Sequence, residues 1–177
     1  YMTIPSENSH NKWKSGLYVS VGDVEFKMIA VAGHTDGFFL IGETEVTKSL
    51  YNAVTGGSDK ASDYPLANVT YSTFQSFITQ LCYQTSLTFS LPSKSQWLYA
   101  SAGGNLSQGY TYSGSNNPDD VAWYALNSGN KVHPVKQLAP NELGIYDMSG
   151  NVREFTSTAG DSHSGVRFKS CLGGFYG

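Results

Sequence analysis

The segment His133–Thr156, HPVKQLAPNELGIYDMSGNVREFT, carries the pattern that decides the fold. Leu143 and Ile145 occupy alternate positions, which is typical of a short strand with one buried face. A Gly-Asn pair between Asp147 and Glu154 tolerates positive φ and favours a tight turn. The turn should bring the two carboxylates together. They then act either as hard oxygen ligands for calcium, with turn carbonyls, or as caps of the turn's backbone N–H groups.

The composition indicates one folded, loop-rich domain. Of the 177 residues, 40% are hydrophobic and only 14% are charged, which argues against intrinsic disorder. Glycine is abundant, at 19 residues, and favours many turns. The net charge of −3 includes no basic block, so a nucleic-acid surface is not expected. No apolar run is long enough to cross a bilayer, so no membrane span is expected.

The cysteines and histidines form no recognisable metal motif. Cys82 and Cys171 are far apart in the sequence, and no Cys-x-x-Cys spacing occurs. The four histidines are scattered without a zinc-type spacing. The two cysteines either pair in a disulfide, if the protein is exported, or remain reduced.

Upstream of the deciding segment, the residue periodicity predicts short strands and three helices. Thr47, Thr70 and Ser93 are the expected N-caps, and the last of these has capping-box spacing with Gln96. Apolar residues at helical spacing after Thr70 predict a helix that faces the core. The expected elements are a strand pair at 18–32, a strand at 38–46, a helix from Thr47 to 56–57, a helix at 70–85, a strand at 87–91 and a helix at 93–102.

The chain divides into a leader and one domain. Residues 1–15 are polar and irregular, and are predicted to form a flexible leader. Residues 16–177 are predicted to form a single α+β domain. Its last third, from residue 105 onward, consists of turns and short strands, and such stretches often carry function.

Four sequence blocks, in order, resemble the formylglycine-generating-enzyme (sulfatase-modifying factor) superfamily. The deciding segment is the third of them. The resemblance implies a C-type-lectin-like fold of the α+β class, with two to three helices packed on short antiparallel strands and with long irregular loops. The blocks are FLIGETEVT at 39–47, LPSKSQWLYASAGG at 91–104, HPVKQLAPNELGIYDMSGNVREFT at 133–156 and LGGF at 172–175.

The resemblance also implies a structural calcium site at the bend. The family holds calcium there with an Asn or Asp side chain, two backbone carbonyls and a Glu. A second family calcium site is not expected, because Val121 stands where the family has Asn. Glu45 matches a family Glu whose role is mostly architectural. The positions that match the first calcium site are Asp147, Gly150, Val152 and Glu154.

The chain departs from the family enzyme at its reactive residues. The enzyme binds copper through two cysteines that follow the Gly-Gly block and oxidises a substrate cysteine to formylglycine. Here no cysteine follows Gly174 before Gly177, so no copper and a non-catalytic member are expected. The alternative is a formylglycine-generating oxidase whose cysteine-bearing tail, and with it the closing C-terminal segment of the domain, lies outside the given sequence.

The family resemblance favours a binding module of a bacterial surface or secreted protein. Some such relatives are variable proteins of diversity-generating retroelements. The ligand would be a protein, peptide or glycan, and the location extracellular or at the cell surface. A structural module of a larger surface protein is a further possibility. Arg153 stands where the family usually has Trp. The candidate ligand-binding residues are Tyr112, Trp123, Tyr124, Arg153, Arg167, Phe175 and Tyr176, and the alternative for each is packing of the loops.

Overall fold

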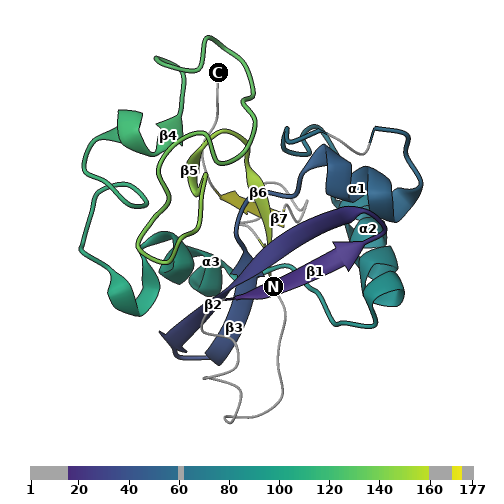
Figure 1. Ribbon diagram of the computed structural model, residues 1–177. Coiled ribbons are helices and arrows are strands. Elements are labelled where there is room, and N and C mark those ends of the chain that lie inside the picture. Colours follow the sequence, from purple (N-terminus) through teal and green to yellow (C-terminus); the bar gives the residue numbers. More distant parts are fainter. Residues whose placement is uncertain (1–15, 60–61, 160–168, 173–177) are drawn as a thin grey trace.

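The structure is a computed structural model that describes residues 16–59, 62–159 and 169–172. Its first element is an antiparallel sheet of three strands in the order β1-β2-β3 (Figure 1). A tight turn at Gly22, with φ of 57°, joins the first two strands and confirms the predicted strand pair. The strands are β1 (Leu17–Val21), β2 (Val24–His34) and β3 (Gly37–Gly42).

Three helices begin at the predicted N-caps. The hydroxyl oxygens of Thr47, Thr70 and Ser93 each accept a hydrogen bond from a backbone N–H of the first turn. The side chain of Gln96 completes the capping box by accepting from the backbone N–H of Ser93. The helix after Thr47 ends at Gly56, as predicted. The helices are α1 (Lys48–Thr55), α2 (Tyr71–Thr85) and α3 (Lys94–Ser101).

The core consists of two apolar clusters, one on each side of the sheet. The first cluster joins the sheet to α1 and α2, through residues such as Met28, Leu50 and Phe77. The second joins it to α3 and the last third of the chain, through residues such as Phe39 and Trp97. Figure 1 shows α1 and α2 on one side of the sheet and α3 on the other. Each fully buried side chain stabilises the fold by about 1.5–3 kcal/mol.

The last third is rich in loops, as the composition predicted. Two short strands pair in parallel, and two others pair in antiparallel fashion. Among the described residues no helix is long and apolar enough to cross a membrane. The short strands are β4 (Ala122–Trp123), β5 (Ser149–Gly150), β6 (Glu154–Ala159) and β7 (Lys169–Leu172).

Two expectations about strands were wrong. The strand expected at 38–46 ends at Gly42. The Glu43 N–H still bonds the carbonyl of Lys27, and residues 43–45 then form bends instead of strand. The segment 87–91 forms an isolated β-bridge at Phe89 and no longer strand of the described structure. Its Phe89 bonds the Cys82 thiol through both its N–H, at 3.1 Å, and its carbonyl, at 3.5 Å. Cys82 is a free thiol in the described structure.

Candidate calcium and ligand-binding sites

The bend predicted from the sequence is a strained, buried turn. Asp147 has φ of 58° and is only 4% exposed. Its carboxylate oxygen Oδ2 accepts a hydrogen bond from the backbone N–H of Lys136 at 2.9 Å. Gly150 has φ of 92° and packs so closely on Trp123 that a Cβ atom would collide with the Trp123 backbone. Glycine is therefore required here both for conformation and for space.

Glu45 and Asn151 hold the turn in place. The Glu45 carboxylate accepts hydrogen bonds from Asn151 Nδ2 at 2.8 Å and from the backbone N–H of Val152 at 2.9 Å. The Asn151 side chain also donates to the carbonyl of His133 and accepts from its backbone N–H. Glu45 is 5% exposed and Asn151 is fully buried. These contacts agree with the architectural role that the resemblance implied for Glu45.

Three carboxyl groups lie close enough to influence one another. Burial raises the pKa of Glu154 to about 7, although the hydrogen bond from Trp97 Nε1 at 3.2 Å opposes the rise. Burial, followed by repulsion from Glu154, raises the pKa of Glu45 well above its usual value. Burial also raises the pKa of Asp147, against the hydrogen bond from the Lys136 N–H. A bound cation would relieve the cost of ionising this group.

The calcium site remains a prediction. The four matching residues, Asp147, Gly150, Val152 and Glu154, all lie on the one bend that runs from two residues before β5 to the first residue of β6. Within the described residues, no group of three or more His, Cys, Asp or Glu side chains is arranged to hold a metal ion. Calcium at this bend would therefore depend on the Gly150 and Val152 carbonyls beside the two carboxylates, as the resemblance implies.

The candidate ligand-binding residues fall into different surroundings. Tyr112 is 38% exposed, in the loop region before β4. Tyr124 is half-buried, and its hydroxyl donates to Asp119 Oδ1 at 2.9 Å. The Asn127 side chain donates to the same Asp119 oxygen, so the loop is braced from within. Tyr112 and Tyr124 lie near enough to affect each other electrostatically. They form a small aromatic surface.

Trp123 has a packing role, as its alternative interpretation allowed. Its ring stacks on His133, with ring centres 3.8 Å apart and planes 13° from parallel. Its buried Nε1 has no hydrogen-bond partner among the described residues. Arg153 is exposed and lines a groove that none of Tyr112, Trp123 and Tyr124 lines, so it does not join their surface. Arg167, Phe175 and Tyr176 lie outside the described residues.

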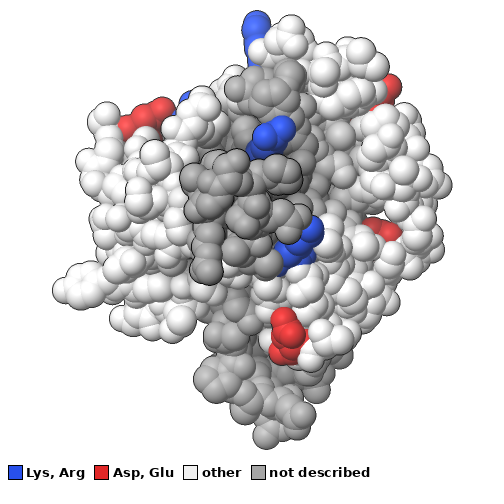
Figure 2. Space-filling view, turned by 180° about the vertical axis from the view of Figure 1, so that it is seen from behind, with Lys and Arg blue, Asp and Glu red and all other residues white. Residues whose placement is uncertain are grey.

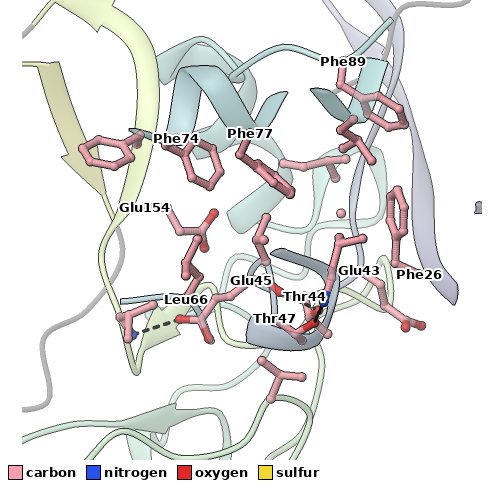
Figure 3. Close-up of a pocket in the computed structure, with 18 of the residues that line it drawn as sticks. Phe26, Glu43, Thr44, Glu45, Thr47, Leu66, Phe74, Phe77, Phe89 and Glu154 are labelled. Carbon is pink, nitrogen blue, oxygen red and sulfur yellow. Dashed lines mark hydrogen bonds between the residues drawn. The ribbon is translucent and has the colours of Figure 1, made fainter. Parts of the chain in front are cut away.

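The groove beside Arg153 was not predicted from the sequence. It has a volume of about 600 Å³ and lies between the sheet, α2 and the bend. Figure 3 shows aromatic rings on one wall and the Glu45 and Glu154 carboxyl groups on another. The sequence signalled only that the α2 residues are apolar and periodic, which is equally expected of a closed core. The aromatic wall of the groove is formed by Phe26, Phe74, Phe77, Phe89 and Phe155.

Charge is dispersed over the face seen in Figure 2. The Lys, Arg, Asp and Glu side chains on this face stand apart from one another, and most of the described surface is uncharged. The described part of this face therefore shows no cluster of positive charge of the kind that binds nucleic acid.

Comparisons with known proteins show what the chain resembles. The family model described as "Sulfatase-modifying factor enzyme 1-like domain" matches residues 19–176. A chaperone protein named LppX from Paenibacillus barcinonensis is 50% identical over 84 residues, a match that spans 38% of this chain and 30% of LppX. The chain thus matches under a third of the length of that curated relative.

Two solved structures share the fold over most of the chain. Treponema denticola variable protein 1 has a TM-score of 0.75 and 26% identity, over 90% of this chain and 87% of that one. CarF has a TM-score of 0.73 and 23% identity, over 85% of this chain and 87% of that one. The similarity to CarF concerns the fold alone.

Proposed function

Because the chain belongs to the sulfatase-modifying factor enzyme 1-like family and has a C-type-lectin-like fold, we propose that it is a non-catalytic binding module. The proposal is carried by the braced aromatic surface of Tyr112 and Tyr124. Rigid aromatic side chains give a large contact area at low entropic cost. The hydrogen bonds of Asp119 to Tyr124 and Asn127 fix the loop before any ligand arrives, which lowers the entropic cost of binding further.

The positions of the cysteines support a non-catalytic role. Copper oxidation needs two soft thiolates held close together. The Cys82 thiol forms hydrogen bonds with the backbone of Phe89, and Cys171 precedes the Gly-Gly block rather than following it. A titration of the full-length natural protein with Cu(I) distinguishes the two functions. Tight stoichiometric copper binding would favour the formylglycine-generating oxidase and would contradict the proposal.

The class of ligand follows from the surface. The exposed Tyr112 and the half-buried Tyr124, whose hydroxyl bonds the acidic Asp119, suit a protein, peptide or glycan surface. The similarity to a variable protein favours a protein or peptide in the manner of retroelement-diversified binders. We propose that the module acts outside the cell or on its surface, with calcium held at the bend as a structural ion. Detection of the protein in the extracellular or cell-envelope fraction tests the location.

The binding function has a direct test. We expect the purified chain to select ligands from a glycan array or from a random peptide display library. Tyr112→Ala and Tyr124→Ala should each weaken the binding of a selected ligand tenfold or more, since an aromatic hot spot contributes about 2 kcal/mol or more to the binding free energy. Tyr83→Ala is the matched control, because Tyr83 is 88% exposed on α2. Unchanged binding by the Tyr112 and Tyr124 variants would contradict the assignment of the surface.

A further inference from the structure

The two tyrosines of the aromatic surface lie on separate loops. Tyr112 begins a tight turn, in which its backbone N–H donates to the carbonyl of Ser115 at 3.0 Å. Tyr124 directly follows the short strand β4. A surface made from two loops keeps one shape only if the loops are fixed relative to each other, because an unfixed loop must be ordered when a ligand binds. The contacts that fix these two loops come from β5, the strand at the bend.

The Tyr112 loop is tied to β5 through Ser149. The Ser149 hydroxyl oxygen Oγ accepts a hydrogen bond from the backbone N–H of Ser113 at 3.1 Å. Ser113 follows Tyr112 and is only 6% exposed, so removing this hydroxyl would leave a buried N–H without its acceptor. Asn141 Nδ2 donates to Ser113 Oγ, also at 3.1 Å. The loop is therefore held at Ser113 through both the backbone and the side chain.

The same strand holds the loop of Tyr124. β5, which contains Ser149, pairs in parallel with β4, which contains Trp123. The backbone N–H of Asn151 donates to the Trp123 carbonyl at 2.8 Å. A Cβ atom at Gly150 would collide with the Trp123 backbone, so the two strands are in close contact. Because Tyr124 follows Trp123 in the chain, its place is also set by β5.

We propose that Ser149 is a positioning residue of the binding surface, and that it sets the place of Tyr112 relative to Tyr124. The link runs from Ser113 to the Ser149 side chain and from β5 to Trp123, so one short strand holds both tyrosine loops. This inference rests on the proposed function and deepens it, because a fixed spacing selects ligands that engage both tyrosines at once. Ser149 acts through Ser113 and needs no contact with the ligand.

A binding measurement separates positioning from a general loss of stability. The probe is the tightest binder recovered from the peptide display library or the glycan array, made synthetically with a fluorescein label. Ser149→Ala should weaken its binding about fivefold in fluorescence polarisation, because the Tyr112 loop must then be ordered on binding. Ser93→Ala is the matched control. It also removes a serine hydroxyl that accepts from a backbone N–H, but at the cap of α3, and should leave the affinity unchanged.

A double-mutant cycle shows whether Ser149 acts through Tyr112. In the Tyr112→Ala background, Ser149→Ala should change the affinity for the probe by less than about twofold, because no side chain is left to position. If the Ser149 hydroxyl only stabilised the fold, its removal would weaken binding by the same factor in both backgrounds. The cycle therefore gives a readout that a merely structural role would not produce.

Amide hydrogen exchange follows the loop in the free protein, without any ligand. Ser149→Ala should speed exchange of the Ser113 N–H about tenfold, because that N–H loses its acceptor. The N–H of Asn151, which bonds the Trp123 carbonyl, should exchange as in the parent, since the pairing of β4 with β5 does not need the hydroxyl.

Four results would overturn the inference while leaving the proposed function intact. They are a probe weakened by Tyr112→Ala but not by Ser149→Ala; an equal effect of Ser149→Ala in the Tyr112→Ala background; an equal loss of affinity in Ser93→Ala; and unchanged exchange at Ser113. If neither library yields a ligand, or if Tyr112→Ala leaves the probe's binding unchanged, the proposed function fails and this inference fails with it.

Discussion

At the scale of single residues, the bend shows how a short motif can be fixed by space as well as by chemistry. Gly150 lies against the backbone of Trp123 at a φ of 92°, and Asn151 joins Glu45 to His133. Removing the Asn151 side chain would leave buried polar groups of Glu45 and His133 without these partners, which costs about 1–3 kcal/mol each. The bend is therefore a point at which small substitutions should have large effects.

A pair of glycine substitutions tests this view. Gly150→Ala should lower the free energy of unfolding by more than about 3 kcal/mol, because strain at positive φ adds to the collision with Trp123. Gly129→Ala is the control, since Gly129 has φ of 61° but no atom near its missing Cβ. Strain alone should cost about 1 kcal/mol there. If the two variants lost equal free energies of unfolding in urea denaturation, the close contact between Gly150 and Trp123 would be contradicted.

Glu154→Gln separates the two interpretations of the bend. If calcium binds, calcium should raise the melting temperature of the parent, EDTA should lower it, and the variant should lose that response. In EDTA the variant should be at least as stable as the parent, because it removes the cost of a buried carboxylate. If Glu154 only caps the turn, the variant should be destabilised equally with and without calcium. Thermal scans of both proteins decide the question.

The pH dependence in EDTA follows from the same carboxyl. Its pKa rises from an ordinary 4.5 to about 7 on folding, so the folded state holds its proton more tightly than the unfolded chain. The contribution of this protonated carboxyl to the free energy of unfolding is fully present below pH 4.5. It is lost as the pH rises to about 7, and the free energy of unfolding then falls by up to about 3 kcal/mol. Relative to Glu154→Gln, the parent should lose roughly 10 °C of melting temperature over this range. If the melting temperatures of the parent and of Glu154→Gln changed with pH in parallel, the pKa of Glu154 would be ordinary and this prediction would be contradicted.

At the scale of elements, the local sequence was sufficient to predict the helix caps and the helix faces. The N-caps Thr47, Thr70 and Ser93 all lie where predicted, because a cap needs only a hydroxyl and the backbone N–H groups that follow it. The strand expected at 87–91 is reduced to an isolated β-bridge at Phe89, whose N–H and carbonyl both bond the Cys82 thiol across the turn after α2.

The cap of α3 gives the prediction at this scale. Ser93→Ala should lower the free energy of unfolding by about 1 kcal/mol, because the Gln96 N–H loses its acceptor. Ser95→Ala keeps the capping box intact and should cost clearly less. A chemical denaturation series on the two variants measures the difference. Equal losses would mean that the capping box does not stabilise α3.

At the scale of the whole molecule, the sheet separates two apolar clusters with different neighbours. The second cluster packs Trp97 and Ile145 beside the bend. The first cluster packs Phe77 and Leu50 between sheet and helices, and borders the groove. The bend proposed to hold calcium therefore packs against one cluster, and the groove borders the other. Such support holds binding residues in place before a ligand arrives.

The sequence alone determined the α+β class, the three capped helices, the first strand pair and the bend that carries Asp147 and Glu154. These features follow from spacing, turn residues and caps, whose physics acts over a few neighbouring residues. Only the tertiary structure decided that Trp123 packs on His133, that Arg153 stands apart from Tyr112, and that the apolar face of α2 borders an open groove. Burial and pairing between distant segments depend on how elements pack, and no local pattern encodes that packing.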